Sequence, residues 1–202
     1  MRPLQNRVDP FGELHAVPAR GLLMGNRGGR FHRDDRTLGD RRHVSKRWIA
    51  CVCEFKDRHR DVWGAGYTEL FFLDEVTALA AGHRPCFECR REDARRFAEL
   101  IAPVGNAPLR ADAIDHLLHA ERLDGFRRRT YRTPLASLPD GAMIVEFQAC
   151  YAVRGAHLLP WSFAGYGAPL SRPEGVVNVL TPPSIVAALA RGYPPLWYDR
   201  QP

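Results

Sequence analysis

The chain has 202 residues, 45% of them hydrophobic, and a net charge of +6, which suits one globular domain or one domain with a small appendage. No apolar run is long enough to cross a bilayer and the first residues lack a signal-peptide core, so we expect no membrane partner and a cytoplasmic location. In that compartment, an odd number of cysteines, five, predicts free thiols or metal ligands rather than disulfides.

The N-terminal part carries much of the positive charge. Residues 1–14 have no periodicity and are predicted to be an extended arm. Residues 18–31 interleave glycines with arginines, which is typical either of a phosphate-binding loop or of a plain flexible loop. Residues 32–47 are strongly charged and are interpreted as a connector, solvated or in contact with a polyanion.

Two strands are predicted next, over residues 48–55 and 67–73. Alternation in the first places Cys51 and Cys53 on the same face. The two strands are expected to form a hairpin beside a metal site.

A short helix is predicted over residues 74–81, with Asp74 as the N-cap and Gly82 after its end. It leads into Pro85-Cys-Phe-Glu-Cys89, followed by a basic amphipathic helix to residue 102. Cys86 and Cys89 can chelate one ion from a single turn, as zinc prefers. Alternatives are a redox pair, which normally follows a strand, and two cysteines that merely pack. The second cysteine pair favours zinc bound by four thiolates, Cys51, Cys53, Cys86 and Cys89; a histidine in place of Cys53 stays open.

The run Ala78-Leu-Ala-Ala-Gly-His-Arg-Pro-Cys-Phe-Glu-Cys-Arg90 resembles the zinc-binding module of Ada-type DNA alkylation-repair proteins. The resemblance covers about residues 48–91. It implies zinc held by Cys86, Cys89 and Cys51, with an upstream strand supplying the last. The family spaces its first pair as Cys-x-x-x-Cys, whereas this chain has Cys51-Val-Cys53, and it offers no secure match for the family's methyl-accepting cysteine.

The segment 111–124 is predicted to be a helix, with Glu121 on the side of Ile114 and Leu118. Asp115 and His119 are spaced to let the carboxylate orient the imidazole. We therefore consider Asp115, His119 and Glu121 as candidate catalytic residues, against the alternative of an ordinary surface network. His119-Ala-Glu121 and the Pro-Cys-x-x-Cys run are both fragments of the zinc-deaminase signature, but in reversed order.

From residue 133 the sequence predicts short strands over 142–153, 157–159 and 176–180, and a last helix that Thr181 caps and Gly192 ends. The prediction is an α+β fold in three segments. These are the arm (1–14), a basic zinc-binding part with a hairpin and helices (15–132), and a small antiparallel β-rich part (133–202).

Clustered arginines indicate a nucleic-acid partner, DNA rather than RNA, although a GC-rich genome also yields many arginines. The expected phosphate contacts are Arg20, Arg27, Arg30, Arg42, Arg47, Arg90, Arg91, Arg127 and Arg128. The sequence favours a zinc-containing nucleic-acid-binding protein of DNA repair or processing. The alternatives are a nucleic-acid or nucleotide hydrolase, glycosylase or zinc deaminase using the three candidate catalytic residues, and a redox-responsive regulator.

Overall fold

The structure, a computed structural model, describes residues 3–56 and 61–199. In this part of the chain the fold is α+β, as predicted, with two main sheets and four α-helices. The helices are α1 (Glu75–Ala80), α2 (Arg91–Ile101), α3 (Ala111–Arg122) and α4 (Pro183–Ala190). None of them is both long and apolar enough to cross a membrane.

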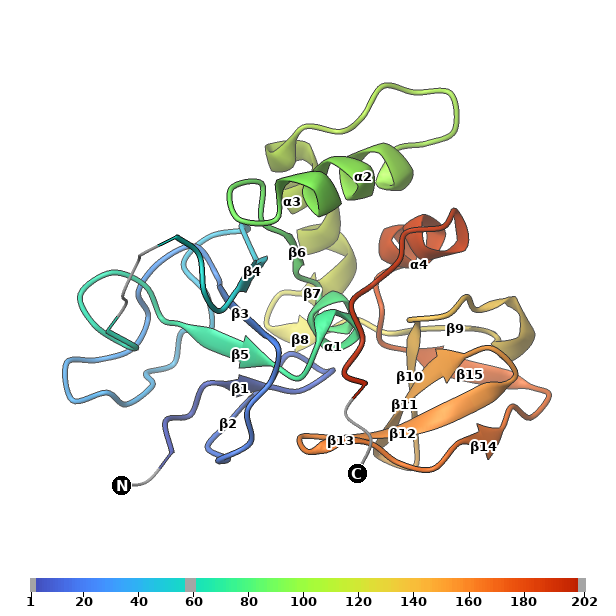
Figure 1. The fold of residues 1–202 in the computed structure, drawn as a ribbon, viewed down its shortest axis with the longest axis horizontal. Coiled ribbons are helices and arrows are strands. Elements are labelled where there is room, and N and C mark those ends of the chain that lie inside the picture. The colour runs from blue at the N-terminus through green and yellow to red at the C-terminus, as the bar shows by residue number, and fades with distance from the viewer. Residues whose placement is uncertain (1–2, 57–60, 200–202) are drawn as a thin grey trace.

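The first sheet contains the N-terminal strands and is the left-hand sheet of Figure 1. Its order is β2 (Leu14–His15), β1 (Arg7–Val8), β5 (Leu70–Phe72), β3 (Leu23–Asn26), β4 (Ile49–Val52) and β6 (Arg84–Pro85). Strand β3 is antiparallel to both β4 and β5. The sequence predicted a hairpin of residues 48–55 and 67–73, which correspond to β4 and β5. That prediction is wrong, because β3 lies between these two strands.

The segment predicted to be a glycine-rich loop supplies this central strand. A side chain at Gly25 would place its Cβ 2.2 Å from the Ile49 carbonyl oxygen, so only glycine allows the strands to approach this closely. The predicted arm likewise joins the sheet, since β1 and β2 lie at its edge and Val8 is buried.

The second sheet is built mainly from the C-terminal part. Its order is β13 (Gly165–Tyr166), β12 (His157–Ser162), β11 (Ala149–Arg154), β10 (Met143–Glu146), β15 (Val176–Val179) and β9 (Tyr131–Pro134), with β14 (Leu170–Ser171) paired to β12. All of its ladders are antiparallel. A small hairpin of β7 (Leu123–Asp124) and β8 (Arg127–Arg128) connects α3 to it, and a 3-10 turn (Leu135–Ser137) lies between β9 and β10.

The two sheets share helix α1, which lies at the centre of the molecule (Figure 1). All six residues of α1 are buried. Ala78 packs into the core of the first sheet, while Val76 and Ala80 pack with Met143 and Ala152 of the second. Helix α1 therefore joins the predicted zinc-binding part and the β-rich part through common cores.

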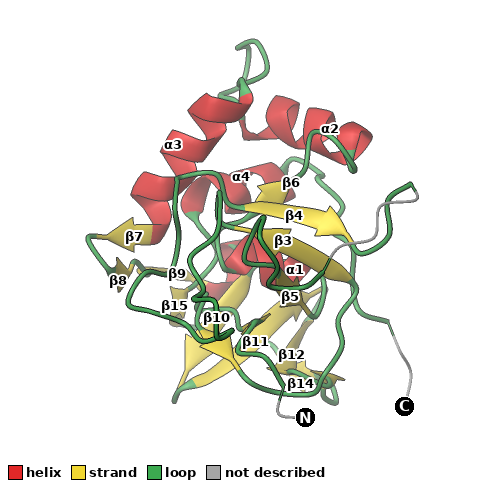
Figure 2. Cartoon of the chain, turned by 90° about the vertical axis from the view of Figure 1, so that its left-hand side faces the viewer, coloured by secondary structure: helices red, strands yellow, loops and turns green. Residues whose placement is uncertain are grey.

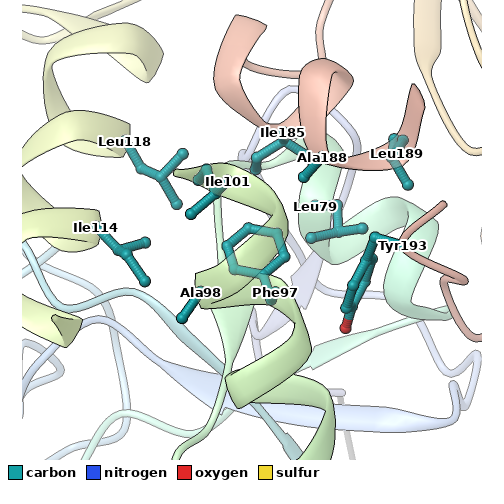
Figure 3. Close-up of a cluster of buried hydrophobic side chains, with 10 residues drawn as sticks. All are labelled: Leu79, Phe97, Ala98, Ile101, Ile114, Leu118, Ile185, Ala188, Leu189 and Tyr193. Carbon is teal, nitrogen blue, oxygen red and sulfur yellow. The ribbon is translucent and has the colours of Figure 1, made fainter. Parts of the chain in front are cut away.

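A third core forms where the helices meet. Leu79 of α1, Phe97 and Ile101 of α2, Ile114 and Leu118 of α3, and Ile185 and Leu189 of α4 converge there, with the ring of Tyr193 beside Phe97 (Figure 3). Figure 2 shows α2 and α3 at one end of the molecule, over the edge of the first sheet that carries β4 and β6. The helix that follows Cys89 is thus fixed to the rest of the chain by a substantial apolar contact.

The helix ends follow the predicted chemistry at α1 but not at α4. Asp74 caps α1 by accepting from the Thr77 backbone N–H at 2.8 Å, and Gly82 adopts a φ of +79° after its end. Thr181 does not cap α4, since its hydroxyl accepts from the Met143 backbone N–H instead. Pro182 occupies the N-cap position of α4.

Candidate metal centre

Three cysteine sulfurs converge where β4 and β6 meet the start of α2. The sulfurs of Cys51, Cys86 and Cys89 all lie within 4.8 Å of one another. Tetrahedral zinc at bonds of about 2.3 Å separates its thiolates by about 3.8 Å, a separation that this limit allows. These three residues could hold a metal ion.

The local folding that brings them together is parallel pairing of β4 with β6. Ala50 pairs with Pro85, and the Cys86 backbone N–H donates to the Ala50 carbonyl at 3.0 Å. Cys51 follows Ala50 directly and Cys86 follows Pro85 directly. Two residues 35 positions apart in the sequence are thus fixed side by side by backbone hydrogen bonds, before any ion binds.

The turn after Cys86 favours its thiolate form. Hydrogen bonds from Cys51 and then from Cys89 lower the pKa of the Cys86 thiol to about 2, helped by the backbone N–H groups of Cys89 and Glu88. The Glu88 N–H lies 3.4 Å from the Cys86 sulfur. Metals bind the thiolate, so donors that stabilise a sulfur anion suit a ligand.

Cys53 lies outside this group. Strand β4 ends at Val52, and Cys53 is exposed, with its thiol donating to the Leu22 carbonyl at 3.5 Å. The alternation that predicted a common face for Cys51 and Cys53 requires the strand to continue one residue further. The structure therefore does not place Cys53 among the converging sulfurs, and no histidine joins that group within the described residues.

A cavity of about 630 Å³ opens onto the cysteines. Its wall includes the three converging sulfurs, Cys53 and the side chains of Tyr67 and Glu69. A ligand in this cavity would have direct access to a metal held by Cys51, Cys86 and Cys89.

Buried ion pairs hold the metal-binding turn to the helices. Arg90 contacts Glu75 of α1 at 2.8 Å and Asp93 of α2 at the same distance. Arg84 forms a bidentate pair with Asp115 of α3, with both N–O distances 2.8 Å. Arg84, Arg90, Glu75 and Asp115 are buried, whereas Asp93 is exposed. The buried pairs fix the residues on both sides of Cys86 and Cys89.

The structure does not bring the three candidate catalytic residues together. Asp115 pairs with Arg84, His119 lies 3.2 Å from Arg122, and Glu121 accepts from Ser184 at the start of α4. The Asp115–His119 hydrogen bond that the spacing suggested does not occur among the described contacts. Each residue has a separate structural partner.

Replacing Glu121 with alanine is expected to destabilise the fold by about 1 kcal/mol, because Glu121 acts as the missing cap of α4. It accepts from the Ser184 backbone N–H at 3.0 Å and from the Ser184 hydroxyl at 2.5 Å. Urea unfolding measures the loss, with Glu99→Ala, on the exposed face of α2, as the control. An unchanged free energy of unfolding would contradict the capping role.

The predicted phosphate-binding arginines divide into exposed and buried groups. The exposed side chains are those of Arg20, Arg30, Arg42, Arg47, Arg91 and Arg127. Within this group Arg30 pairs with Asp34 and Arg47 with Asp112. Arg27 and Arg90 are buried and Arg128 is half-buried. Arg90 is neutralised by its two carboxylates. The exposed group remains suited to an interface.

The second charged cluster surrounds Trp48. The guanidinium carbons of Arg27 and Arg122 lie 3.9 Å and 4.0 Å from the centre of the Trp48 ring system. The rings of His83 and His43 lie tilted to the same ring, with centroids 5.0 Å and 5.5 Å from it. The sequence analysis missed Arg122, although it follows Ile114 and Leu118 at spacings of four, which places it on the buried side of α3.

The free energy of unfolding is expected to fall as the pH decreases through about 6.5. Burial, followed by the charges of Arg27, Arg122 and Arg128, lowers the pKa of His83 well below its usual value. Burial and then Arg122, His43, Lys46 and His116 lower the pKa of His119 to about 4. The unfolded state therefore binds more protons below about pH 6.5, so stability is complete above that pH and is lost towards acid.

The loss reaches at most about 1.4 kcal/mol per pH unit for buried His83, and less for His119, which water partly screens. Urea unfolding between about pH 7 and pH 5 measures this loss of stability. Any bound metal is quantified in each sample, because protonation of the thiolates would release it and would lower the stability as well. His119→Asn should make the dependence shallower, and exposed His116→Gln should leave it nearly unchanged. A stability that rises towards acid would contradict this electrostatic account.

Comparison with known proteins adds no further constraint: no protein-family model, no curated protein and no solved structure matches this chain.

Proposed function

We propose that this chain is a zinc protein that engages nucleic acid, DNA rather than RNA, in DNA repair or processing. The observation that carries the proposal is the convergence of Cys51, Cys86 and Cys89 on one point, within 4.8 Å of one another. The exposed arginines between residues 20 and 127 support the nucleic-acid part.

Zinc fits the donor set best. Three thiolates are soft ligands, which favour zinc over magnesium or calcium. A redox role for Cys86 and Cys89 also has local support, because β6 leads directly into Cys86 and α2 follows Cys89. A third sulfur at the same point distinguishes the two interpretations, since a disulfide pair needs only two thiols.

Two measurements test the proposal. Elemental analysis of protein purified without added metal should find about one zinc per chain. Anisotropy of a labelled oligonucleotide should show binding that weakens steeply with salt, because arginine–phosphate contacts release counterions. Protein free of zinc, or affinity for nucleic acid that ignores salt, would contradict the corresponding half of the proposal.

A second candidate, an enzyme acting on nucleic acid or a nucleotide as a hydrolase, glycosylase or deaminase, is favoured by one observation. Three converging sulfurs supply three of four tetrahedral positions, and they border a cavity of about 630 Å³. Catalytic zinc sites commonly have three protein ligands and leave one position for water or substrate. When bound, zinc would supply Lewis acidity there.

Cobalt substitution distinguishes a closed site from an open one, because the intensity of the sulfur-to-cobalt absorption reports the number of thiolate ligands. If Cys53 moves in as the fourth ligand, Cys53→Ser should lower that intensity. If the position belongs to a molecule from the cavity, the spectrum should be unchanged by Cys53→Ser and altered by small competing ligands. The first result would end the enzymatic alternative at this centre.

A further inference from the structure

Three buried guanidinium groups, those of Arg27, Arg122 and Arg128, cluster without an anion. Arg27 is 1% exposed and Arg122 is fully buried. Arg27 donates to the Gly12 carbonyl at 2.7 Å, Arg122 to the Gly82 carbonyl at 2.9 Å, and Arg128 to the carbonyls of Ala80 and Leu180. None of the three forms an ion pair with a carboxylate in the part of the chain that the structure describes.

Such an arrangement is costly unless another group compensates the charge. Burying a cation with only neutral partners forfeits its hydration, and the three cations also repel one another. Burial is the main cause that lowers the pKa of Arg27 to about 9 and that of Arg122 to about 8. Arg128 lowers both pKa values further, while Glu13 and Asp9 partly oppose the shift at Arg27 and Asp115 that at Arg122. Guanidinium groups stay protonated at neutral pH, so the positive charge persists.

Two of these arginines face a cavity of about 560 Å³ beside Trp48. Arg27 and Arg128 line it from within, while Arg41 and Arg42 line it from the exposed loop before β4. Two carboxylates, those of Glu13 and Asp40, also line it, but both side chains are exposed, where water and salt screen them. The charged side chains on the inner part of the wall are therefore arginines, and the buried Asp9 carboxylate, which does not line the cavity, offsets part of their charge.

Hydrogen-bond donors remain unused at this wall. The Nε–H of Arg128 is buried without a partner among the described residues. Arg27 uses its Nε, one Nη1 and one Nη2 hydrogen on His83, the Arg42 carbonyl and the Gly12 carbonyl, which leaves two of its five N–H groups. An anion with several acceptor oxygens could take these donors.

An exposed aromatic side chain stands at the rim. Phe126 is 100% exposed at the tip of the β7–β8 hairpin and lines the same cavity; Figure 2 shows this hairpin beside the end of α3. An exposed ring next to arginines is typical of a stacking platform for a base of a single strand. Trp48 cannot serve this purpose, since Arg27 and Arg122 cover its ring.

We propose that this cavity binds the phosphate of a nucleotide unit, with Arg27, Arg42 and Arg128 on the phosphate and Phe126 on the base. A single strand and a free nucleotide both offer the ligand that this cavity fits, which is a phosphate joined through a sugar to a nucleobase. This inference deepens the proposed function, because it places the contact with nucleic acid away from the cysteines. It rests on the proposed function only where the bound phosphate is said to come from a nucleic-acid strand and not from a free nucleotide.

The test combines two probes with matched variants of the metal-loaded full chain. Thermal unfolding is followed with pyrophosphate against chloride of equal ionic strength, and anisotropy is measured with a labelled oligothymidylate and with thymidine monophosphate as competitor. Arg42→Gln should weaken oligonucleotide binding about tenfold and remove most of the pyrophosphate stabilisation. Phe126→Ala should weaken oligonucleotide binding about tenfold and leave the pyrophosphate effect intact.

The controls are Arg95→Gln, exposed on α2, and Phe147→Ala, which is 99% exposed at the β10–β11 turn; neither should change binding. Arg42 and Phe126 are exposed, so their variants should fold, and circular dichroism checks this. Arg27→Gln should abolish the pyrophosphate effect if it folds.

The outcomes distinguish a failure of the proposed phosphate site from a failure of the proposed nucleic-acid-binding function. Oligonucleotide binding unaffected by Arg42→Gln and Phe126→Ala would overturn the site while leaving a nucleic-acid protein intact. Pyrophosphate stabilisation that depends on Arg42, together with thermal stabilisation by thymidine monophosphate but no affinity for the oligothymidylate, would support the site and contradict a strand as its source. Pyrophosphate stabilisation equal in wild type and Arg42→Gln would overturn the proposal.

Discussion

Replacing Cys86 with serine is expected to release the metal and to destabilise the protein more than any other single change proposed for it. Cys86 lies at the centre of the group, accepts from the backbone N–H of Glu88 and is joined through its own N–H to Ala50 of β4. Structural zinc contributes about 10 kcal/mol or more of apparent binding free energy at neutral pH. Losing one of three thiolates removes much of that contribution from the folded state.

The measurement is zinc per chain together with the thermal midpoint, for wild type and for Cys51→Ser, Cys86→Ser and Cys89→Ser. The control is Cys150→Ser, because Cys150 is also buried but lies on β11, in the second sheet. Cys150→Ser should retain the metal. Full metal occupancy in Cys51→Ser or Cys86→Ser would show that the three sulfurs do not bind one ion.

Replacing Asp115 with alanine is expected to lower the free energy of unfolding by about 3–5 kcal/mol. The Asp115 carboxylate and the Arg84 guanidinium are both buried and share two hydrogen bonds of 2.8 Å. Removing the carboxylate leaves the Arg84 charge buried, and its remaining partners among the described residues are the Pro85 carbonyl and the face of Phe87. The expected loss of stability therefore comes mainly from the uncompensated Arg84 cation, and only in part from the lost hydrogen bonds.

Asp112→Ala is the matched control, since Asp112 is on the same helix and pairs with Arg47 in water, with 70% of its side chain exposed. Exposed pairs of this kind contribute at most about 1 kcal/mol. Urea unfolding of both variants gives the comparison. Equal losses for the two variants would show that burial does not determine the strength of the Arg84–Asp115 pair.

The metal-binding segment was largely predictable from sequence because its signals are local. The Asp74 cap, the glycine at position 82 and the Cys-x-x-Cys run each depend on residues within one or two turns. Cys51 was proposed as a ligand because it belongs to the second cysteine pair, and the strand predicted around it is present as β4. The alternation also predicted that Cys53 lies on the same face as Cys51. The strand ends at Val52, however, and no residue type near this position indicates that the strand ends there.

The central strand β3 was not predictable, because its glycines locally favour a loop, whereas pairing with β4 and β5 makes the segment a strand. Gly21 and Gly25 are turn-forming residues by composition, yet a Cβ at Gly21 would lie 1.7 Å from the Phe72 carbonyl oxygen. These glycines allow neighbouring backbones to approach, which only the paired strands reveal. Likewise, the burial of Arg27 depends on carbonyl groups and on Trp48, all distant in sequence, whereas arginine by composition predicts exposure.

Helix α1 begins with two buried carboxylates that have partners far away in the sequence. Asp74 accepts from the Tyr166 hydroxyl and the Tyr198 backbone N–H, and Glu75 accepts from the Tyr193 hydroxyl and the Leu196 backbone N–H. Before those distant segments dock, Asp74 has Thr77 and Glu75 has Arg90 as nearer partners. Contacts of such long sequence separation form slowly, so we expect the burial of α1 to be completed late in folding, when residues 193–198 dock.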